Sequence, residues 1–240
     1  MIFEEYFSKL TDILEDIKNT QREKIMAAAD MVAETIKNDG IIYIFGCGHS
    51  HLIGLDCFYR AGGLVNVSAM LDTDLMLHNG AAKSSKMEKM SGIAESVFER
   101  YCLTEKDTLI VVSTSGKNAV PVEMAKVAAK NGIKNISVVS SAYFEDKTEG
   151  EKLYEISDIY IDNCVPHGDA VMDITGTEVK MGSVSTAASS FILQAVLLEA
   201  AENAAKSGKK VPIYMSGNIE GGADYNKALI KEYMPRIKHL

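Results

Sequence analysis

Apolar residues recur at helical spacing through the first forty positions of the chain. The residues of this apolar face are Phe3, Tyr6, Phe7, Leu10, Ile13 and Ile17. Their spacing predicts an amphipathic helix. The next segment, Thr20-Gln-Arg-Glu23, fits a capping box and predicts the start of a second helix that runs to about Asn38. Because Asp39-Gly40 then breaks the pattern, residues 1–39 are expected to form a helical hairpin.

From Ile41 onwards the apolar residues come in short runs of strand length. The predicted strands cover Ile41–Phe45, Val65–Met70, Thr108–Val112, Ile136–Ser140 and Ile159–Asp162. These runs are rich in β-branched residues and do not alternate cleanly between apolar and polar positions. That pattern is typical of strands that are buried on both faces of a parallel sheet.

Helical segments separate several of these strands. The predicted helices cover His51–Ala61, Lys86–Tyr101 and Ala119–Asn131. Strands and helices in alternation predict right-handed crossovers and a parallel sheet. A long helix over Thr186–Lys206 follows the fifth strand, and residues 207–240 hold a glycine-rich loop and a last helix. The chain is therefore predicted to be a single α/β domain over residues 1–240, with a doubly wound five-stranded sheet in residues 40–206.

Composition and charge exclude several classes of protein without indicating a function. The 25 basic residues against 33 acidic ones give a net charge of −8, and no basic block is longer than a pair. Such a chain is a poor candidate for binding nucleic acids or a membrane surface. No apolar run approaches the ~20 residues of a membrane span, and the N-terminus lacks the apolar core of a secretory signal. The four cysteines show no Cys-x-x-Cys spacing, so reduced thiols and a cytoplasmic location are expected.

Two loops rich in glycine and hydroxyl groups follow the first and third predicted strands. They are Gly46-Cys47-Gly48-His49-Ser50 and Ser113-Thr114-Ser115-Gly116-Lys117-Asn118. In a doubly wound sheet of strand order 2-1-3-4-5, the first and third strands are neighbours that flank the topological switch point. Ligands bind in the crevice at that point, so the two loops are expected to form one site.

The second loop has the features of a phosphate site. Ser113, Ser115 and Asn118 precede a helix predicted to begin near Ala119, where free backbone N–H groups and the helix dipole favour an anion. Their side chains add donors without charge, and Gly116 lets the backbone approach closely. The alternative is a well-capped helix, since serine and asparagine are common caps. The expected substrate-binding residues are Gly48, Ser50, Ser113, Thr114, Ser115, Gly116 and Asn118.

Other glycine and metal motifs have the wrong spacing. The segment Gly46-Cys47-Gly48 begins a dinucleotide fingerprint, but His51 stands where the third glycine is needed. The segment 115–118 lacks the upstream glycine and the hydroxyl residue of a P-loop. Cys47, His49 and His51 alternate without a second cluster, which is not a zinc spacing. No cofactor and no metal is therefore expected.

The two loops and the distance between them resemble the sugar isomerase (SIS) domain family, whose members bind phosphosugars. That family has a Gly-x-Gly-x-Ser loop after its first strand and a Ser-x-Ser-Gly-x-Thr loop after its third. The matching segments here are GCGHS and STSGKN, with Asn118 where threonine is commonest. The resemblance covers about residues 40–205. With its tail, the chain is most similar to an uncharacterised bacterial family that has one SIS domain and resembles the phosphoheptose isomerases.

A third segment extends this resemblance towards catalysis. Gly176-Thr177-Glu178-Val179 is similar to a Gly-x-Glu-Ile segment in the isomerase domain of glucosamine-6-phosphate synthase, whose glutamate is the catalytic base. The likeness implies that Glu178 is the base, and a carboxylate favoured by a helix dipole is the alternative. Phosphoheptose isomerases place a glutamate on the helix after the first loop, where this chain has Arg60. Their own catalytic machinery is therefore not expected here.

Four histidines are candidates to assist the base. His49 is the first choice, as the acid–base group that opens the sugar ring. His51 falls inside a predicted helix and is expected to be structural. His78 and His167 lie on predicted loops, which often carry function, and a histidine from a neighbouring subunit completes the site in related isomerases.

The features together predict an aldose–ketose isomerase that acts on a sugar phosphate by enediolate proton transfer. Two alternatives remain open, a non-catalytic phosphosugar sensor and a lyase of the N-acetylmuramic acid 6-phosphate etherase type. The first forty residues carry 5 basic and 9 acidic side chains, which is the wrong charge for a DNA-binding domain.

The exposed apolar face of the first helix also predicts an assembly. Leaving a large apolar side chain in water costs ~1.5–3 kcal/mol relative to burying it. SIS domains resemble one another in forming dimers or tetramers with sites at the interfaces. A homodimer or homotetramer is therefore expected.

Overall fold

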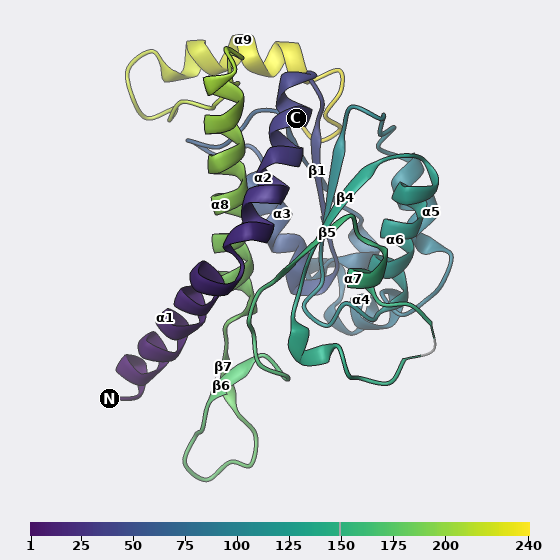
Figure 1. The fold of residues 1–240 in the computed structure, drawn as a ribbon, viewed down its shortest axis with the longest axis vertical. Coiled ribbons are helices and arrows are strands. Elements are labelled where there is room, and N and C mark those ends of the chain that lie inside the picture. The colour runs from purple at the N-terminus through teal and green to yellow at the C-terminus, as the bar shows by residue number, and fades with distance from the viewer. Residues whose placement is uncertain (149) are drawn as a thin grey trace.

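The computed structural model describes residues 1–148 and 150–240, which form a five-stranded parallel sheet with helices on both faces (Figure 1). The strands of this sheet are β1 (Ile42–Gly46), β2 (Val67–Met70), β3 (Thr108–Val112), β4 (Lys134–Val139) and β5 (Ile159–Asp162). Their order is β2-β1-β3-β4-β5 and each neighbouring pair is parallel, which confirms the predicted fold class.

Helices occupy most of the remaining described residues. The α-helices are α1 (Ile2–Thr20), α2 (Arg22–Lys37), α3 (His51–Cys57), α4 (Ala81–Met87), α5 (Ile93–Glu99), α6 (Ala119–Lys130), α7 (Leu153–Ile156), α8 (Ser185–Lys206) and α9 (Gly222–Tyr233). Single turns of 3-10 helix cover η1 (Gly48–Ser50), η2 (Thr73–Leu75), η3 (Leu77–Asn79) and η4 (Ser141–Tyr143). The prediction of one helix over Lys86–Tyr101 is wrong, because Gly92 adopts a left-handed conformation with φ of 88° and separates α4 from α5.

The side chains of the central strands point alternately to the two faces of the sheet, and both faces are covered. On β3, Ile110 and Val112 belong to the core formed with α1, α2, α3 and α8. Leu109 and Val111 belong to the core formed with α5, α6, α7 and α9. All five residues of β3 are buried, which explains why the strands read as unbroken apolar runs in the sequence.

The first two helices do not form the predicted hairpin. Gln21 alone joins α1 to α2, and a single residue with near-helical backbone angles cannot reverse the chain. The predicted capping box is also absent, since Thr20 donates its hydroxyl to the Asp16 carbonyl at 2.7 Å. The buried Gln21 side chain accepts the backbone N–H of Asp162 at 3.1 Å, which fixes the bend against β5. Figure 1 shows α1 leading away from the sheet as an arm.

A small antiparallel hairpin, not predicted from the sequence, lies between β5 and α8. Its strands are β6 (Ala170–Met172) and β7 (Met181–Ser183). It packs against α1, where Tyr6 donates its hydroxyl to the Ser183 carbonyl at 2.9 Å and Lys9 donates to the Val171 carbonyl at 2.9 Å. In the described part of the chain, no helix has the length and apolar character needed to cross a membrane.

Candidate functional site

The loops after β1 and β3 lie side by side at the carboxyl edge of the sheet. Gly46 at the end of β1 pairs in register with Val112 at the end of β3, so both loops leave the sheet at the same level. Between them lies a pocket of about 250 Å³. The residues that line this pocket are Cys47, His49, Ser50, Glu88, Val112, Ser113, Thr114, Ser115, Asn118, Tyr143, Asp169 and Ser185. The predicted proximity of the two loops is thus confirmed.

Two glycines give the loops their shape. A Cβ atom on Gly46 would lie 2.6 Å from the backbone carbonyl of Ser50, so only glycine lets the first loop fold back so tightly. Gly116 has φ of 59°, a left-handed conformation, and a Cβ there would lie 3.2 Å from Cγ1 of Val139. Both positions therefore require glycine for close packing of the loop backbone.

The second loop ends at the first turn of α6, as predicted. Asn118 occupies the N-cap position of this helix, which begins at Ala119, and its side chain makes no capping hydrogen bond to the helix backbone. Ser113 is nearly buried, and its hydroxyl accepts the backbone N–H of Gly116 at 3.3 Å. The hydroxyls of Ser113, Thr114 and Ser115 therefore stand at a helix N-terminus, where backbone N–H groups and the dipole favour an anion.

One carboxylate in the pocket was not predicted from the sequence. Glu88 directly follows α4, is half-buried, and accepts a hydrogen bond on Oε1 from Nδ2 of Asn118 at 3.0 Å. Burial raises the pKa of Glu88 above its usual value, and the nearby Lys89 ammonium partly opposes this effect. Glu88 was not predicted as a site residue, because the sequence analysis placed it inside one continuous helix over Lys86–Tyr101.

The opposite wall of the pocket is built by the N-terminus of α8 and the loop after β5. Asp169 accepts the backbone N–H groups of Val184 and Ser185 at 3.0 and 2.8 Å, and the Ser185 hydroxyl at 2.7 Å. Tyr143 stacks on His167 with ring centroids 4.3 Å apart, and its hydroxyl accepts the Gly168 N–H at 2.8 Å. These contacts bring a flat aromatic side chain and a fully hydrogen-bonded carboxylate to the pocket.

The structure separates Glu178 from the other predicted site residues. The alternative of a carboxylate at a helix start does not hold, because the β6–β7 hairpin intervenes and Glu178 is exposed in the loop between its strands. The residues that line the pocket come instead from the loops after β1 and β3, from the ends of α4 and η4, from the loop after β5 and from the start of α8. Gly48 and Gly116 do not line the pocket. Each has a positive φ and so allows a turn in its loop.

The histidines divide into pocket and supporting positions. His49 is exposed and lines the pocket. His51 begins α3 and is buried, with Nδ1 against the Gly48 carbonyl. Its ring lies 5.7 Å from that of the exposed His78, while His167 lies at the edge of the pocket behind Tyr143.

The surroundings of Cys47 disfavour a thiolate in the pocket. Cys47 is buried at the start of the first loop, and this burial raises the pKa of its thiol far above the usual value. A neutral thiol is a poor nucleophile and a poor metal ligand. Lys117 is held away by its ion pair with Asp146 at 2.5 Å, so hydroxyl, amide and backbone groups dominate the lining.

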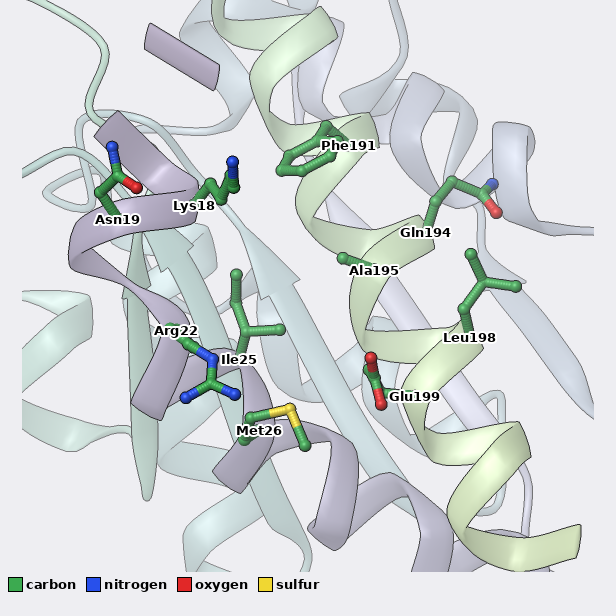
Figure 2. Close-up of a pocket in the computed structure, with 10 residues that line it drawn as sticks. All are labelled: Lys18, Asn19, Arg22, Ile25, Met26, Phe191, Gln194, Ala195, Leu198 and Glu199. Carbon is green, nitrogen blue, oxygen red and sulfur yellow. The ribbon is translucent and has the colours of Figure 1, made fainter. Parts of the chain in front are cut away.

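A larger groove of about 750 Å³ lies on the helical face of the molecule (Figure 2). Its lining residues are Lys18, Asn19, Arg22, Ile25, Met26, Phe191, Gln194, Ala195, Leu198 and Glu199, from the end of α1, from α2 and from α8. Figure 2 shows the Phe191 ring on α8 facing the space beside α2. The groove is mainly apolar, so it suits protein packing better than recognition of a small polar ligand.

Comparison with known proteins identifies the family. The family model described as SIS domain matches residues 5–140, which is more than half of the chain. The chain therefore belongs to the SIS domain family. The matched range includes both loops of the pocket and Glu88, and it ends before the segment that contains Glu178.

Over nearly its whole length the chain is similar to the proteins called UPF0309. It is 39% identical to the UPF0309 protein TTE0306 of Caldanaerobacter subterraneus, over 98% of each chain. It is 38% identical to the UPF0309 protein of Geobacillus thermodenitrificans, over 98% of this chain and 96% of that one.

Solved structures show the same fold at low sequence identity. A phosphoheptose isomerase from Francisella tularensis matches with a TM-score of 0.58 and 16% identity, over 83% of this chain and 96% of its own. The NanR protein of Vibrio vulnificus, solved in complex with ManNAc-6P, matches with a TM-score of 0.51 and 14% identity, over 100% of this chain and 71% of its own. At these identities the likeness concerns the fold alone.

Proposed function

We propose that this chain binds a sugar phosphate and interconverts its aldose and ketose forms by enediolate proton transfer. The observation that carries the proposal is the pocket between the loops after β1 and β3. Ser50, Ser113, Thr114, Ser115 and Asn118 would hold the phosphate at the N-terminus of α6. Hydroxyls, an amide and backbone N–H groups bind a phosphate dianion without a basic side chain.

The sugar would occupy the part of the pocket lined by His49, Tyr143 and Asp169. His49 is placed to transfer protons when the sugar ring opens, because it is exposed to the pocket and retains solvent access. Asp169 would hold the start of α8 in place beside the sugar, because it accepts both backbone N–H groups and the hydroxyl there. The chemistry needs no redox cofactor, since a proton moves between neighbouring carbons and no electrons leave the substrate. The four free thiols fit an action in the reducing cytoplasm.

A second candidate function is a sensor that binds a phosphosugar without converting it. The NanR protein, which has a similar fold and was solved in complex with ManNAc-6P, supports this candidate. Both functions require the same phosphate site, and only the isomerase requires exchange of the substrate proton with solvent.

The test begins with a thermal-shift screen of the purified protein against sugar phosphates of five to seven carbons, including amino and N-acetyl forms. A ligand that binds the folded state raises the melting temperature by mass action. We expect at least one sugar phosphate to raise it, and the matching unphosphorylated sugar to have no effect. A panel without any stabilising compound would contradict the phosphate site.

Catalysis is then tested by incubating the stabilising compound with the protein in D₂O. An isomerase is expected to incorporate deuterium at the carbon next to the carbonyl, as followed by NMR, and to form the isomeric sugar phosphate. Binding without incorporation of deuterium would select the sensor.

We also propose that a second copy of the chain covers the groove of Figure 2. The first two turns of α1 expose Phe3 and Phe7, and α8 exposes Leu198 in the groove. Lys18 and Arg22 at the groove complement the acidic residues that accompany the apolar face of α1. Seating α1 of one copy on the groove of the other would bury both apolar faces.

The substitution Leu198→Glu is expected to shift the protein from a dimer or tetramer to a monomer, because it places a charge in the apolar groove. Size-exclusion chromatography with light scattering measures the mass directly. Ile219→Glu is the matched control, since Ile219 is an exposed apolar residue of the C-terminal tail. A monomeric wild-type protein would contradict the assembly.

A further inference from the structure

The carboxylate that would move the substrate proton can be assigned from the pocket itself. Two carboxylates line it, Glu88 and Asp169, whereas Glu178 is exposed in the β6–β7 loop. A general base needs an oxygen with a lone pair that is directed at the substrate and not fully engaged by other donors. The hydrogen bonds of the two carboxylates therefore decide between them.

Asp169 is engaged on both of its oxygens. Oδ1 accepts two backbone N–H groups, from Val184 and Ser185, and Oδ2 accepts the Ser185 hydroxyl. Three donors therefore occupy lone pairs on both oxygens of this carboxylate. Asp169 is thereby suited to fixing the start of α8 and unsuited to taking a proton.

Glu88 has one hydrogen-bond donor among the described residues, the Asn118 amide, which reaches Oε1 at 3.0 Å. Its position is fixed at the backbone as well, because its carbonyl accepts the Val120 N–H at 3.0 Å. The end of α4 is thus joined to the first turn of α6, the helix whose N-terminus forms the phosphate site. The charged group that acts on Glu88 is Lys89, its neighbour in sequence.

The amide of Asn118 explains a departure from the family pattern. Threonine is commonest at this place in the resembling loops, and a threonine hydroxyl can bond a phosphate. Asparagine adds an N–H that extends to the Glu88 carboxylate. One residue can then contact the phosphate loop and orient the carboxylate.

We propose that Glu88 is the catalytic base and that Asn118 is the residue that positions its carboxylate. This inference rests on the proposed isomerase function. Glu88 takes the proton from the carbon next to the carbonyl, and the C–H electron pair forms the double bond of the enediolate while the carbonyl oxygen gains the negative charge. The proton held on the Glu88 carboxyl exchanges with solvent, and Glu88 then delivers a solvent-derived proton to the former carbonyl carbon. The carbon that was first deprotonated carries a hydroxyl group, and the proton of this hydroxyl moves to the oxygen of the former carbonyl. The new carbonyl therefore forms on that carbon without any co-reactant.

The decisive comparison is between Glu88→Gln and its matched control Glu178→Gln, each of which removes one carboxylate and keeps its shape. We expect Glu88→Gln to lower the rate of solvent-deuterium incorporation by at least about 100-fold while the sugar phosphate still raises the melting temperature. Glu178→Gln is expected to change neither quantity by more than about twofold. Loss of incorporation in Glu178→Gln, or its retention in Glu88→Gln, would overturn the assignment.

The role of Asn118 is tested by Asn118→Thr, which keeps a hydroxyl for the phosphate and removes the amide. Without this donor the charged form of Glu88 loses stabilisation, so the pKa of the carboxyl rises. The acid limb of the pH–rate profile for incorporation should therefore move to higher pH, and the rate at neutral pH should fall. A profile that is only scaled down, without movement of the acid limb, would refute the positioning role.

Failure of the proposed function would look different from failure of this assignment. A wild-type protein that binds a sugar phosphate and incorporates no deuterium is a sensor, and the catalytic role of Glu88 falls with the isomerase. Glu88→Asp is the control for a folding defect. Aspartate keeps the carboxylate on a side chain that is one methylene shorter, so this variant is expected to retain partial incorporation of deuterium. Complete loss of binding in all three variants at this end of the pocket would show that they act on the fold and would overturn the assignment.

Discussion

Replacing Ser115 by alanine is expected to weaken binding of a sugar phosphate by about 10- to 100-fold. The Ser115 hydroxyl lines the pocket at the N-terminus of α6 and is half-buried. A hydrogen bond to a charged group contributes ~1.5–3 kcal/mol, and each 1.4 kcal/mol corresponds to about a factor of ten in affinity. Isothermal titration calorimetry of the stabilising compound measures the loss. The stability of the unliganded protein should hardly change, because the hydroxyl is partly solvated in the folded chain.

The matched control is Ser96→Ala, which removes an exposed hydroxyl from α5 that donates to the Ile93 carbonyl. It should leave the affinity for the sugar phosphate unchanged. Equal affinities of wild type and Ser115→Ala would show that the second loop does not hold the phosphate. A serine that only capped the helix would give that result, together with a lower stability of the unliganded protein.

Replacing Phe45 by alanine is expected to lower the free energy of unfolding by about 3–5 kcal/mol. Phe45 lies on β1, has 1% of its surface exposed, and is among the largest fully buried side chains. It packs in the core between the sheet and α5, α6, α7 and α9. Since domains are stable by only ~5–15 kcal/mol, this loss is a large fraction of the total.

Urea denaturation at a fixed protein concentration provides the measurement, with a lower midpoint and an unchanged slope as the expected result. Val179→Ala is the control, because Val179 is 75% exposed in the β6–β7 loop and should have little effect. A loss below about 1 kcal/mol for Phe45→Ala would mean that this face of the sheet does not depend on close packing.

The strands and their order could be read from the sequence because they depend on local patterns. Buried parallel strands require unbroken apolar runs such as Thr108–Val112, which coincides with β3. The alternation of strands and helices then restricts the topology to a few arrangements. The loop after β3 could also be predicted from the sequence, since Gly116 and the serines before it form a local motif that precedes a helix.

The errors lie where distant segments decide the structure. The predicted hairpin of α1 and α2 failed because Gln21 bonds to Asp162 of β5, far along the chain. The segment around Glu178 shares its pattern with a catalytic motif, but it folds into a hairpin whose strands pair β6 with β7. The contacts that hold both segments come from far along the chain, since Gln21 bonds to Asp162 and the hairpin is bonded to Tyr6 of α1.

The sequence by itself determined the sheet, its strand order and the two loops that border the pocket, since each follows from hydrophobic periodicity and turn chemistry within short segments. Only the tertiary structure decided which carboxylate meets those loops. Glu88 follows a short helix with no motif around it, and it reaches the pocket because α4 ends against the first turn of α6. A contact between residues thirty positions apart depends on how helices pack, and one chain's pattern does not encode that packing locally.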